Sequence, residues 1–174
     1  MMKNDIYIEI ISDFEKDIDV NAVKECSLKS LIIGSNSLCK DSISISITSS
    51  EKIKILNKKY LKQSSSTDVL AFPVNLNWHR GVENFDVKDN FKDKGYLGDI
   101  FISFENIISQ SQFYMTGIEL ELSIILAHGI LHLLGYDHYD GNSKKEMDAL
   151  TIDVIKSLNL DYEKAKISLG SRNE

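Results

Sequence analysis

The segment from residue 128 to residue 138, HGILHLLGYDH, constrains the fold of this chain more than any other stretch. Three of the four histidines among the 174 residues fall within it. His128 and His132 are four residues apart in an apolar run, so on a helix they lie about one turn apart on the same face. His138 would point to the opposite side if the helix continued. Gly135 can adopt the left-handed conformation that ends helices, so we expect the chain to turn back there and bring the three imidazoles together.

Three imidazoles in an apolar segment predict a metal site. A single histidine on an apolar helix is typically a hydrogen-bonded core residue, but burying three with unpaired nitrogens costs several kcal/mol. A divalent ion satisfies all three, so we predict His128, His132 and His138 as its ligands. Three neutral nitrogens and no thiolate favour zinc, although nickel or copper would also be accepted. Three protein ligands leave a fourth position open, which is typical of catalytic rather than structural zinc.

The residues beside the histidines limit the chemistry. Asp137 directly precedes a predicted ligand, so it is placed either for a hydrogen bond that orients a ligand or for a plain turn-forming role, and both interpretations stay open. The spacing H-x-x-x-H-x-x-G-x-x-H is also that of the metzincin proteases. Those enzymes need a glutamate directly after the first histidine as general base, and here that position is Gly129. A metzincin-like protease site would therefore have its three metal ligands in this chain but would lack its general base.

Length, charge and cysteine content narrow the class of protein. The length predicts one domain over residues 1–174, with a frayed tail at 170–174. The net charge of −6 provides no global attraction to nucleic acid or anionic lipid, so RNA would have to bind a local patch. Cys26 and Cys39 match no close-spaced metal motif and indicate buried thiols in a reducing compartment. We therefore expect a cytoplasmic protein.

Membrane association is not expected either. The N-terminal residues MMKNDIYIEIIS carry Asp5 and Glu9 where a signal peptide needs an unbroken apolar stretch. The apolar run over 123–136 is too short to span a bilayer.

The order of patterns along the chain predicts an α+β fold. Residues 42–48 alternate strictly between polar residues and isoleucine, which indicates a strand with one buried and one polar face. Residues 118–134 are apolar on nearly all sides, which is typical of a central helix. We expect a small mixed sheet of about four strands covered by helices, with the central helix carrying two metal ligands. The expected strands are 6–10, 42–48, 67–74 and 97–103. The expected helices are 19–33, 50–61, 104–115 and 118–134, and Gly34 is expected to end the first of them. A last helix is expected to be capped by Asn142 or Ser143 and to end near Leu158.

Two groups of residues are candidates for contact with nucleic acid. A lysine-rich run on the predicted 50–61 helix could bind phosphates, and a solvated helix face is the alternative. In the irregular stretch 75–96, an aromatic and basic group could stack on or hold a single strand, and a loop anchor is the alternative. The lysine-rich run comprises Lys52, Lys54, Lys58, Lys59 and Lys62. Of these, Lys58, Lys59 and Lys62 are the predicted substrate-binding residues. The aromatic and basic group comprises Trp78, His79 and Arg80.

The segment HGILHLLGYDH resembles the signature of the YbeY family of bacterial endoribonucleases, also called rRNA maturation factors. That pattern is H-G-x-L-H-L-x-G-Y-D-H, and every fixed position is met here. Further blocks recur in the family's order and together cover roughly residues 50 to 150. These blocks are Leu56-Asn57-x-x-Tyr60, Thr67-Asp68-Val69-Leu70-x-Phe72-Pro73, Leu97-Gly98-Asp99-Ile100-x-Ile102-Ser103 and Glu146-Met147.

The resemblance implies a function as well as a fold. It implies a single-domain α+β protein with one zinc ion per chain, held by the residues matching His128, His132 and His138. It also implies cleavage of single-stranded RNA, maturation of the 3′ end of small-subunit rRNA, and ribosome quality control. The implied partners are rRNA and the small ribosomal subunit or its associated factors, with no DNA.

Two positions depart from the family pattern. Leu61 stands where the family usually has an arginine taken to be important for activity, and Ser66 stands where it usually has proline. An arginine could bind phosphate through two hydrogen bonds, whereas leucine cannot, and the adjacent Lys62 offers only a point charge. Two alternatives therefore stay open: a metal-dependent hydrolase of a peptide or small phosphoester, and a ribosome-associated metal-binding factor with weakened catalysis. Whether water or the ribose 2′-hydroxyl attacks stays open too.

Overall fold

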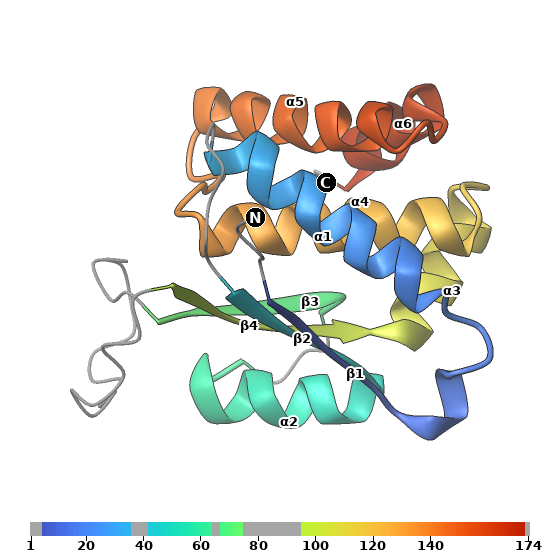
Figure 1. Cartoon of the computed structure of the whole chain (residues 1–174), viewed down its shortest axis with the longest axis vertical. Coiled ribbons are helices and arrows are strands. Elements are labelled where there is room, and N and C mark those ends of the chain that lie inside the picture. The colour runs from blue at the N-terminus through green and yellow to red at the C-terminus, as the bar shows by residue number, and fades with distance from the viewer. Residues whose placement is uncertain (1–4, 36–41, 64–66, 75–94, 173–174) are drawn as a thin grey trace.

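The structure, a computed structural model, describes residues 5–35, 42–63, 67–74 and 95–172. Figure 1 shows how the elements are arranged in space. The elements in chain order are β1 (Ile6–Ile10), a short 3₁₀ helix η1 (Ser12–Phe14), α1 (Val20–Ser35), β2 (Ser42–Thr48), α2 (Ser50–Tyr60), β3 (Val69–Pro73), β4 (Tyr96–Ser103), α3 (Phe104–Phe113), α4 (Ile118–Leu133), α5 (Gly141–Ser157) and α6 (Tyr162–Ser171).

The four strands form one mixed sheet, as expected. The strand order is β1-β2-β4-β3, with β1, β2 and β4 parallel and β3 antiparallel to β4. Pro73, which has no N–H to donate, lies on the edge strand β3 where its missing donor leaves no neighbour unpaired. Helix α2 covers one face of the sheet, α1 and α4 cover the other, and α5 and α6 lie over these two (Figure 1). The α+β prediction is confirmed.

The main core lies between the sheet and helices α1 and α4. The three isoleucines of β2 are fully buried and pack in one cluster with residues of both helices. Almost every residue of α4 is buried, because the helix is enclosed by the sheet, α1 and α5. The polar face of β2 is also covered, contrary to expectation: Ser46 and Thr48 are only 7% and 2% exposed. On that face α2 and the sheet bring the rings of Tyr60, Phe72 and Phe101 together.

Gly34 does not end the first helix, contrary to the prediction. Helix α1 continues through it to Ser35. A Cβ at position 34 would lie 2.6 Å from Leu134 Cδ1 and 2.8 Å from Leu131 Cδ2. The glycine is therefore needed for the close packing of α1 on α4, and its role could not be read from a local pattern.

The C-terminal part differs from the prediction in two ways. The cap of α5 is Asp140, whose carboxylate accepts the backbone N–H groups of Asn142 and Ser143 at 2.8 and 3.0 Å. A further helix, α6, follows and includes Gly170 and Ser171, so the predicted frayed tail from 170 is wrong for these residues. The physical reason is Arg172, whose guanidinium is held by carboxylates of distant segments.

The remaining expectations concern membranes, cysteines and residues outside the described ranges. Within the described ranges no single helix is long and apolar enough to cross a membrane. The pair α3 and α4 passes the same test but is bent by 119° at the break between them. Burial raises the pKa of the Cys26 thiol to about 12, as expected for a structural cysteine. Cys39, Ser66, Trp78, His79 and Arg80 lie outside the described residues.

Candidate metal centre

The break after α4 has the hydrogen bonds of a Schellman motif. Gly135 has a φ of 92°, the left-handed conformation expected for it. The N–H of Gly135 donates to the carbonyl of His132, and the N–H of Tyr136 donates to that of Leu131, both at 3.0 Å. The Tyr136 hydroxyl donates to the Gly34 carbonyl at 2.8 Å and ties the turn to α1. The chain therefore folds back at the predicted residue.

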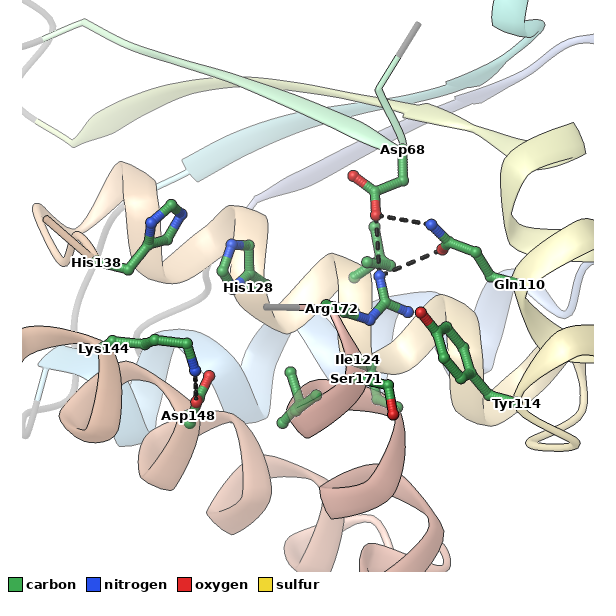
Figure 2. Close-up of a pocket in the computed structure, with 12 residues that line it drawn as sticks. Asp68, Gln110, Tyr114, Ile124, His128, His138, Lys144, Asp148, Ser171 and Arg172 are labelled. Atoms are coloured by element: carbon green, nitrogen blue, oxygen red, sulfur yellow. Dashed lines mark hydrogen bonds and ion pairs between the residues drawn. The ribbon is translucent and has the colours of Figure 1, made fainter. Parts of the chain in front are cut away.

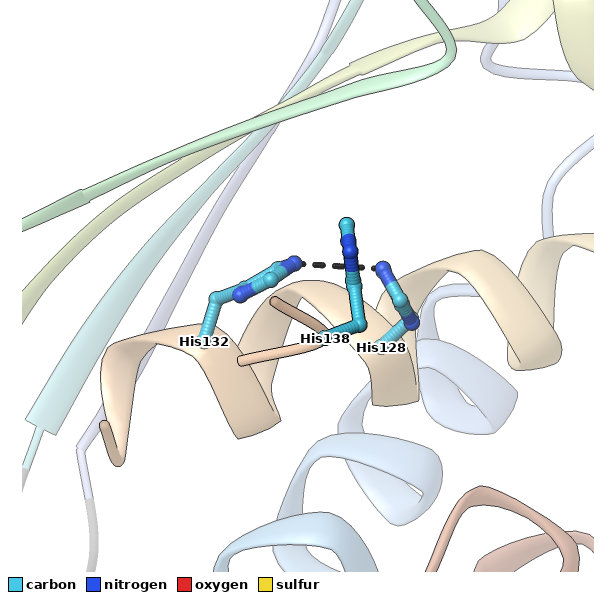
Figure 3. Close-up of side chains that lie close together, drawn as sticks. All are labelled: His128, His132 and His138. Atoms are coloured by element: carbon cyan, nitrogen blue, oxygen red, sulfur yellow. Dashed lines mark hydrogen bonds between the residues drawn. The ribbon is translucent and has the colours of Figure 1, made fainter. Parts of the chain in front are cut away.

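This turn brings the three histidines together (Figure 3). The ring centroids of His128 and His138 are 5.5 Å apart, and those of His132 and His138 are 5.3 Å apart. Nε2 of His132 lies 3.1 Å from Nε2 of His128. One ring nitrogen from each histidine lies within 4.8 Å of the other two, with His128 and His132 partly buried and His138 exposed. The three side chains therefore meet, as the spacing in the sequence led us to expect.

The protonation state of the cluster suits a metal. The Tyr136 carbonyl can only accept, so Nδ1 of His132 donates to it at 3.0 Å and leaves the lone pair of Nε2 facing His128. Burial lowers the pKa of His132. It also lowers the pKa of His128 to about 3, and the neighbouring His132 and His138 add to this effect. Neutral imidazole is the form that binds metal ions.

The spacing of the nitrogens fits a single ion. Two nitrogens that each lie about 2.1 Å from a tetrahedral ion are roughly 3.4 Å apart. The observed 3.1 Å between Nε2 of His128 and Nε2 of His132 is close to this value, and a ring nitrogen of His138 lies within 4.8 Å of the other two ligand nitrogens. The His128, His132 and His138 cluster could therefore hold a metal ion.

The two other notable positions of the motif, Asp137 and Gly129, make contacts of their own. One oxygen of Asp137 accepts the backbone N–H of His138 at 2.7 Å, which is a turn-forming contact. A Cβ at Gly129 would lie 3.0 Å from Val69 Cγ2 and 3.3 Å from Ile100 Cγ2. Position 129 is thus turned toward the sheet, so the base that metzincins have there could not be accommodated in this packing.

Two of the three histidines border a cavity of about 740 Å³ (Figure 2). His128 and His138 lie at one end of it. The walls come from α3, α4, α5, α6 and the residue that precedes β3, so five segments far apart in the sequence contribute. The polar lining residues are Asp68, Gln110, Tyr114, His128, His138, Lys144, Asp148, Ser171 and Arg172.

The other end of the cavity is occupied by the guanidinium of Arg172. Its Nη1 donates to Asp68 Oδ2 at 2.9 Å and to Gln110 Oε1 at 3.2 Å. Its Nη2 pairs with Glu121, a carboxylate on α4 that is fully buried. The Tyr114 ring centroid lies 5.5 Å from the guanidinium carbon. Sequence reasoning assigned none of these residues to the site, and only Asp68 carried any signal, as part of the Thr67-Asp68-Val69-Leu70 block.

The predicted substrate-binding lysines lie elsewhere. Lys58 and Lys59 are exposed on α2, and Lys62 is exposed in the turn that follows. Because α2 covers the opposite face of the sheet from α4, these lysines are separated from the histidines by the sheet (Figure 1). Leu61, at the end of α2, is 39% exposed and is not among the cavity lining.

Comparison with known proteins places this fold and site in a family. A model of the family described as YbeY, Endoribonuclease YbeY, matches residues 9–159. The chain belongs to this family. A YbeY endoribonuclease of Acetivibrio thermocellus is 35% identical over 160 residues, which cover 90% of this chain and 98% of that protein. One from Heliobacterium modesticaldum is 37% identical over 124 residues, which cover 70% of this chain and 72% of that protein.

A solved structure is similar as well. The solution structure of TM1509 from Thermotoga maritima has a TM-score of 0.56 and covers 88% of each chain at 23% identity. This likeness supports the fold alone. The YbeY family match ends at residue 159, so α6 and Arg172 lie beyond it.

Proposed function

We propose that this protein is a cytoplasmic, zinc-dependent endoribonuclease that cleaves single-stranded RNA in the 3′-end maturation of small-subunit rRNA and in ribosome quality control. Family membership supports the endoribonuclease activity, because the relatives bear that name. The observation that carries the metal dependence is the meeting of three histidine nitrogens within 4.8 Å. The zinc assignment rests on the donor set of neutral nitrogens without thiolate.

The chain's own residues provide a rigid ligand set beside an open space. His132 is oriented by its hydrogen bond to Tyr136, and the Schellman turn positions His138. A zinc ion held there would supply an acidified water and polarise a phosphoryl oxygen. The adjoining cavity of about 740 Å³ is within the range of small-ligand sites and is open to a segment of RNA.

Recognition of RNA has to rely on local contacts in this acidic protein. The formal charge of −6 gives no long-range attraction to phosphates. The lysines of α2 form a local basic surface on the far side of the sheet, and we propose that Lys58, Lys59 and Lys62 hold a distant part of the rRNA or of the ribosome.

Metal analysis of the purified protein, paired with a cleavage time course on a short single-stranded RNA, tests this function. We expect one zinc per chain and cleavage that a chelator stops and added zinc restores. The same RNA in a duplex, and casein as a peptide substrate, serve as comparisons. Zinc-loaded protein that hydrolyses casein but leaves RNA intact would replace the ribonuclease proposal with a protease.

Leu61 supports a second candidate, a ribosome-associated metal-binding factor with weakened catalysis. The family's usual arginine is absent there, and Leu61 projects from the end of α2 without lining the cavity. The variant Leu61→Arg separates the two candidates. If the wild-type protein cleaves RNA, the nuclease proposal stands, whereas activity found only in Leu61→Arg favours the binding factor.

A further inference from the structure

Asp137, the one carboxylate of the HGILHLLGYDH segment, is held in the turn by the backbone N–H of His138, 2.7 Å from one of its oxygens. Position 129 faces Val69 and Ile100 at contact distance. Phosphodiester cleavage needs a group that removes the proton of the attacking hydroxyl. A second carboxylate that could take this role comes from another segment of the fold.

The packing of α4 on β3 brings such a segment to the cavity. Because Gly129 has no side chain, the helix approaches the strand until the Cβ position of residue 129 is 3.0 Å from Val69 Cγ2. Asp68 directly precedes Val69 in the chain, and His128 directly precedes Gly129. Both side chains line the same cavity (Figure 2). The negative charge of Asp68 is close enough to act on the His128 imidazole electrostatically.

The two oxygens of Asp68 differ in their surroundings. Oδ2 accepts from Arg172 Nη1 at 2.9 Å and from Gln110 Nε2 at 3.2 Å, which fixes the carboxylate in place. Oδ1 accepts from the hydroxyl of its chain neighbour Thr67 at 3.3 Å, a longer and weaker interaction. Figure 2 shows the second oxygen turned away from Arg172 and Gln110. The side chain is 20% exposed, so a solute in the cavity can reach it.

The other carboxylate of the cavity wall in the described part of the chain is already used. Asp148 pairs with Lys144 one turn earlier on α5. Asp68 is also ion-paired, to Arg172, but Arg172 and Gln110 bind Oδ2 and leave Oδ1 with only the longer contact to Thr67. Asp68 is thus the carboxylate whose position and partners suit proton transfer.

We infer that Asp68 is the general base of this site, with Oδ1 accepting the proton of the nucleophile. This inference rests on the proposed ribonuclease function. The O–H bond of the attacking hydroxyl, of water or of the ribose, breaks as its proton moves to Oδ1, and its oxygen forms a bond to phosphorus. The bond from phosphorus to the leaving ribose oxygen breaks, and Asp68 returns the proton to that oxygen. The carboxylate is then regenerated, so no other reactant is consumed.

Arg172 and Gln110 are positioning residues in this scheme. They hold Oδ2 from α6 and from α3, and neither has to touch the RNA. Arg172 follows α6, beyond the residues 9–159 matched by the family model, and it orients a residue of the Thr67-Asp68-Val69-Leu70 block.

The test is Asp68→Asn, which keeps the shape of the side chain and removes its basicity. Cleavage of a saturating single-stranded RNA is expected to slow by roughly 10²–10⁴-fold, the usual contribution of a general base. Zinc content, measured by metal analysis, and affinity for RNA are expected to stay within about twofold of wild type. The matched control is Asp153→Asn, which removes the same charge from an exposed position of α5 outside the cavity lining, where it pairs with Lys156, and should change cleavage by about twofold at most.

Asp68→Ser serves the same purpose if Asp68→Asn does not fold, with the same expectation. Folded Asp68 variants that cleave RNA within threefold of wild type would overturn the inference. A variant that loses zinc would overturn it too, because Asp68 would then be holding the metal. If zinc-loaded wild-type protein does not cleave RNA at all, the proposed function itself fails, an outcome distinct from an active Asp68 variant.

Discussion

The two ends of the cavity satisfy their polar groups in opposite ways. At one end, three imidazoles converge with one nitrogen of each within 4.8 Å of the other two, and His138 is exposed. At the other end, the Arg172 guanidinium is only 15% exposed and is paired with Asp68 and with the buried Glu121. The nitrogen lone pairs at the histidine end require a cation from solution, whereas at the Arg172 end the guanidinium is itself the cation.

Because of this difference, we expect one end of the cavity to bind a ligand and the other end to stabilise the fold. A site that is completed by a ligand can lose that ligand without unfolding here, because burial lowers the pKa of His128 and His132 and keeps them uncharged, and His138 is exposed to solvent. A buried charge cluster contributes to the fold through complete pairing, so removal of one member leaves the others desolvated. The histidine end should therefore control activity, and the Arg172 end should control folding and the position of Asp68.

The largest effect is expected from His132→Ala. Loss of the ligand that Tyr136 orients should abolish zinc binding and lower RNA cleavage by at least about 10³-fold, since the ion supplies several kcal/mol to the transition state. Metal analysis and a cleavage time course measure this. His79→Ala, at the fourth histidine, should keep the metal. Full cleavage by a metal-free His132→Ala protein would contradict the assignment of function to this end.

Arg172→Met should mainly affect stability. It leaves Glu121 buried without a cation, and breaking a buried pair in this way costs about 3–5 kcal/mol in the free energy of unfolding. Urea denaturation measures the loss. Lys166→Met, which removes an exposed pair with Glu163, should cost at most about 1 kcal/mol. Equal losses in the two variants would show that the Arg172 cluster contributes no more than a surface pair.

Gly129→Ala probes the packing between the two ends. The added methyl group meets Val69 and Ile100, and overpacking of this kind costs about 1–3 kcal/mol. It should also slow RNA cleavage, because α4 moves relative to Asp68. Gly141→Ala, where the new group meets nothing within 4 Å, should be neutral or stabilising by up to about 1 kcal/mol. A Gly129→Ala protein as stable and active as wild type would disprove the close-approach role.

The metal-free protein should lose stability as the pH is lowered. The pKa of His128 is about 3 in the folded state and 6.5 in a free side chain. Between these values the unfolded chain binds more protons, so the free energy of unfolding falls as the pH drops below about 6.5, by at most about 1.4 kcal/mol per pH unit for one proton. Calorimetry at pH 7 and pH 5 measures the change. His128→Asn should show a shallower slope, and an unchanged slope would assign it to other groups.

The smallest effect is expected for Lys58→Gln, Lys59→Gln and Lys62→Gln combined. These lysines lie across the sheet from the histidines, so the rate of cleavage at saturating RNA should stay within about twofold of wild type. RNA affinity should fall modestly. The slope of the logarithm of the binding constant against the logarithm of the salt concentration should become shallower by about 0.7 for each phosphate that the variant no longer binds. Fluorescence anisotropy over a range of salt measures both. A large drop in the saturated rate would place the lysines in the catalytic site instead.

Local sequence patterns were enough to predict the four strands, most of the helices and the meeting of the three histidines. The polar–isoleucine alternation of 42–48 predicted β2, and the apolar run before Gly135 predicted a central helix that ends in a reversal. These features follow from short-range physics: side-chain periodicity, and the freedom of glycine at a positive φ. His128, His132 and His138 could be named because one turn of helix and one turn of chain are enough to bring them together.

Only the tertiary structure decided what surrounds those ligands. Gly34 reads locally as a helix end, yet it serves the packing of α1 on α4. Asp68 and Arg172 are 104 positions apart in the sequence, and no periodicity relates a residue before β3 to a residue after α6. From the sequence alone the lysines of α2 could lie beside the histidines, but in the structure the sheet separates them from that site. The sequence by itself determined, through local geometry, that three histidines able to hold a metal ion come together, whereas the cavity beside them and the pairing of Arg172 with Asp68 depend on long-range packing.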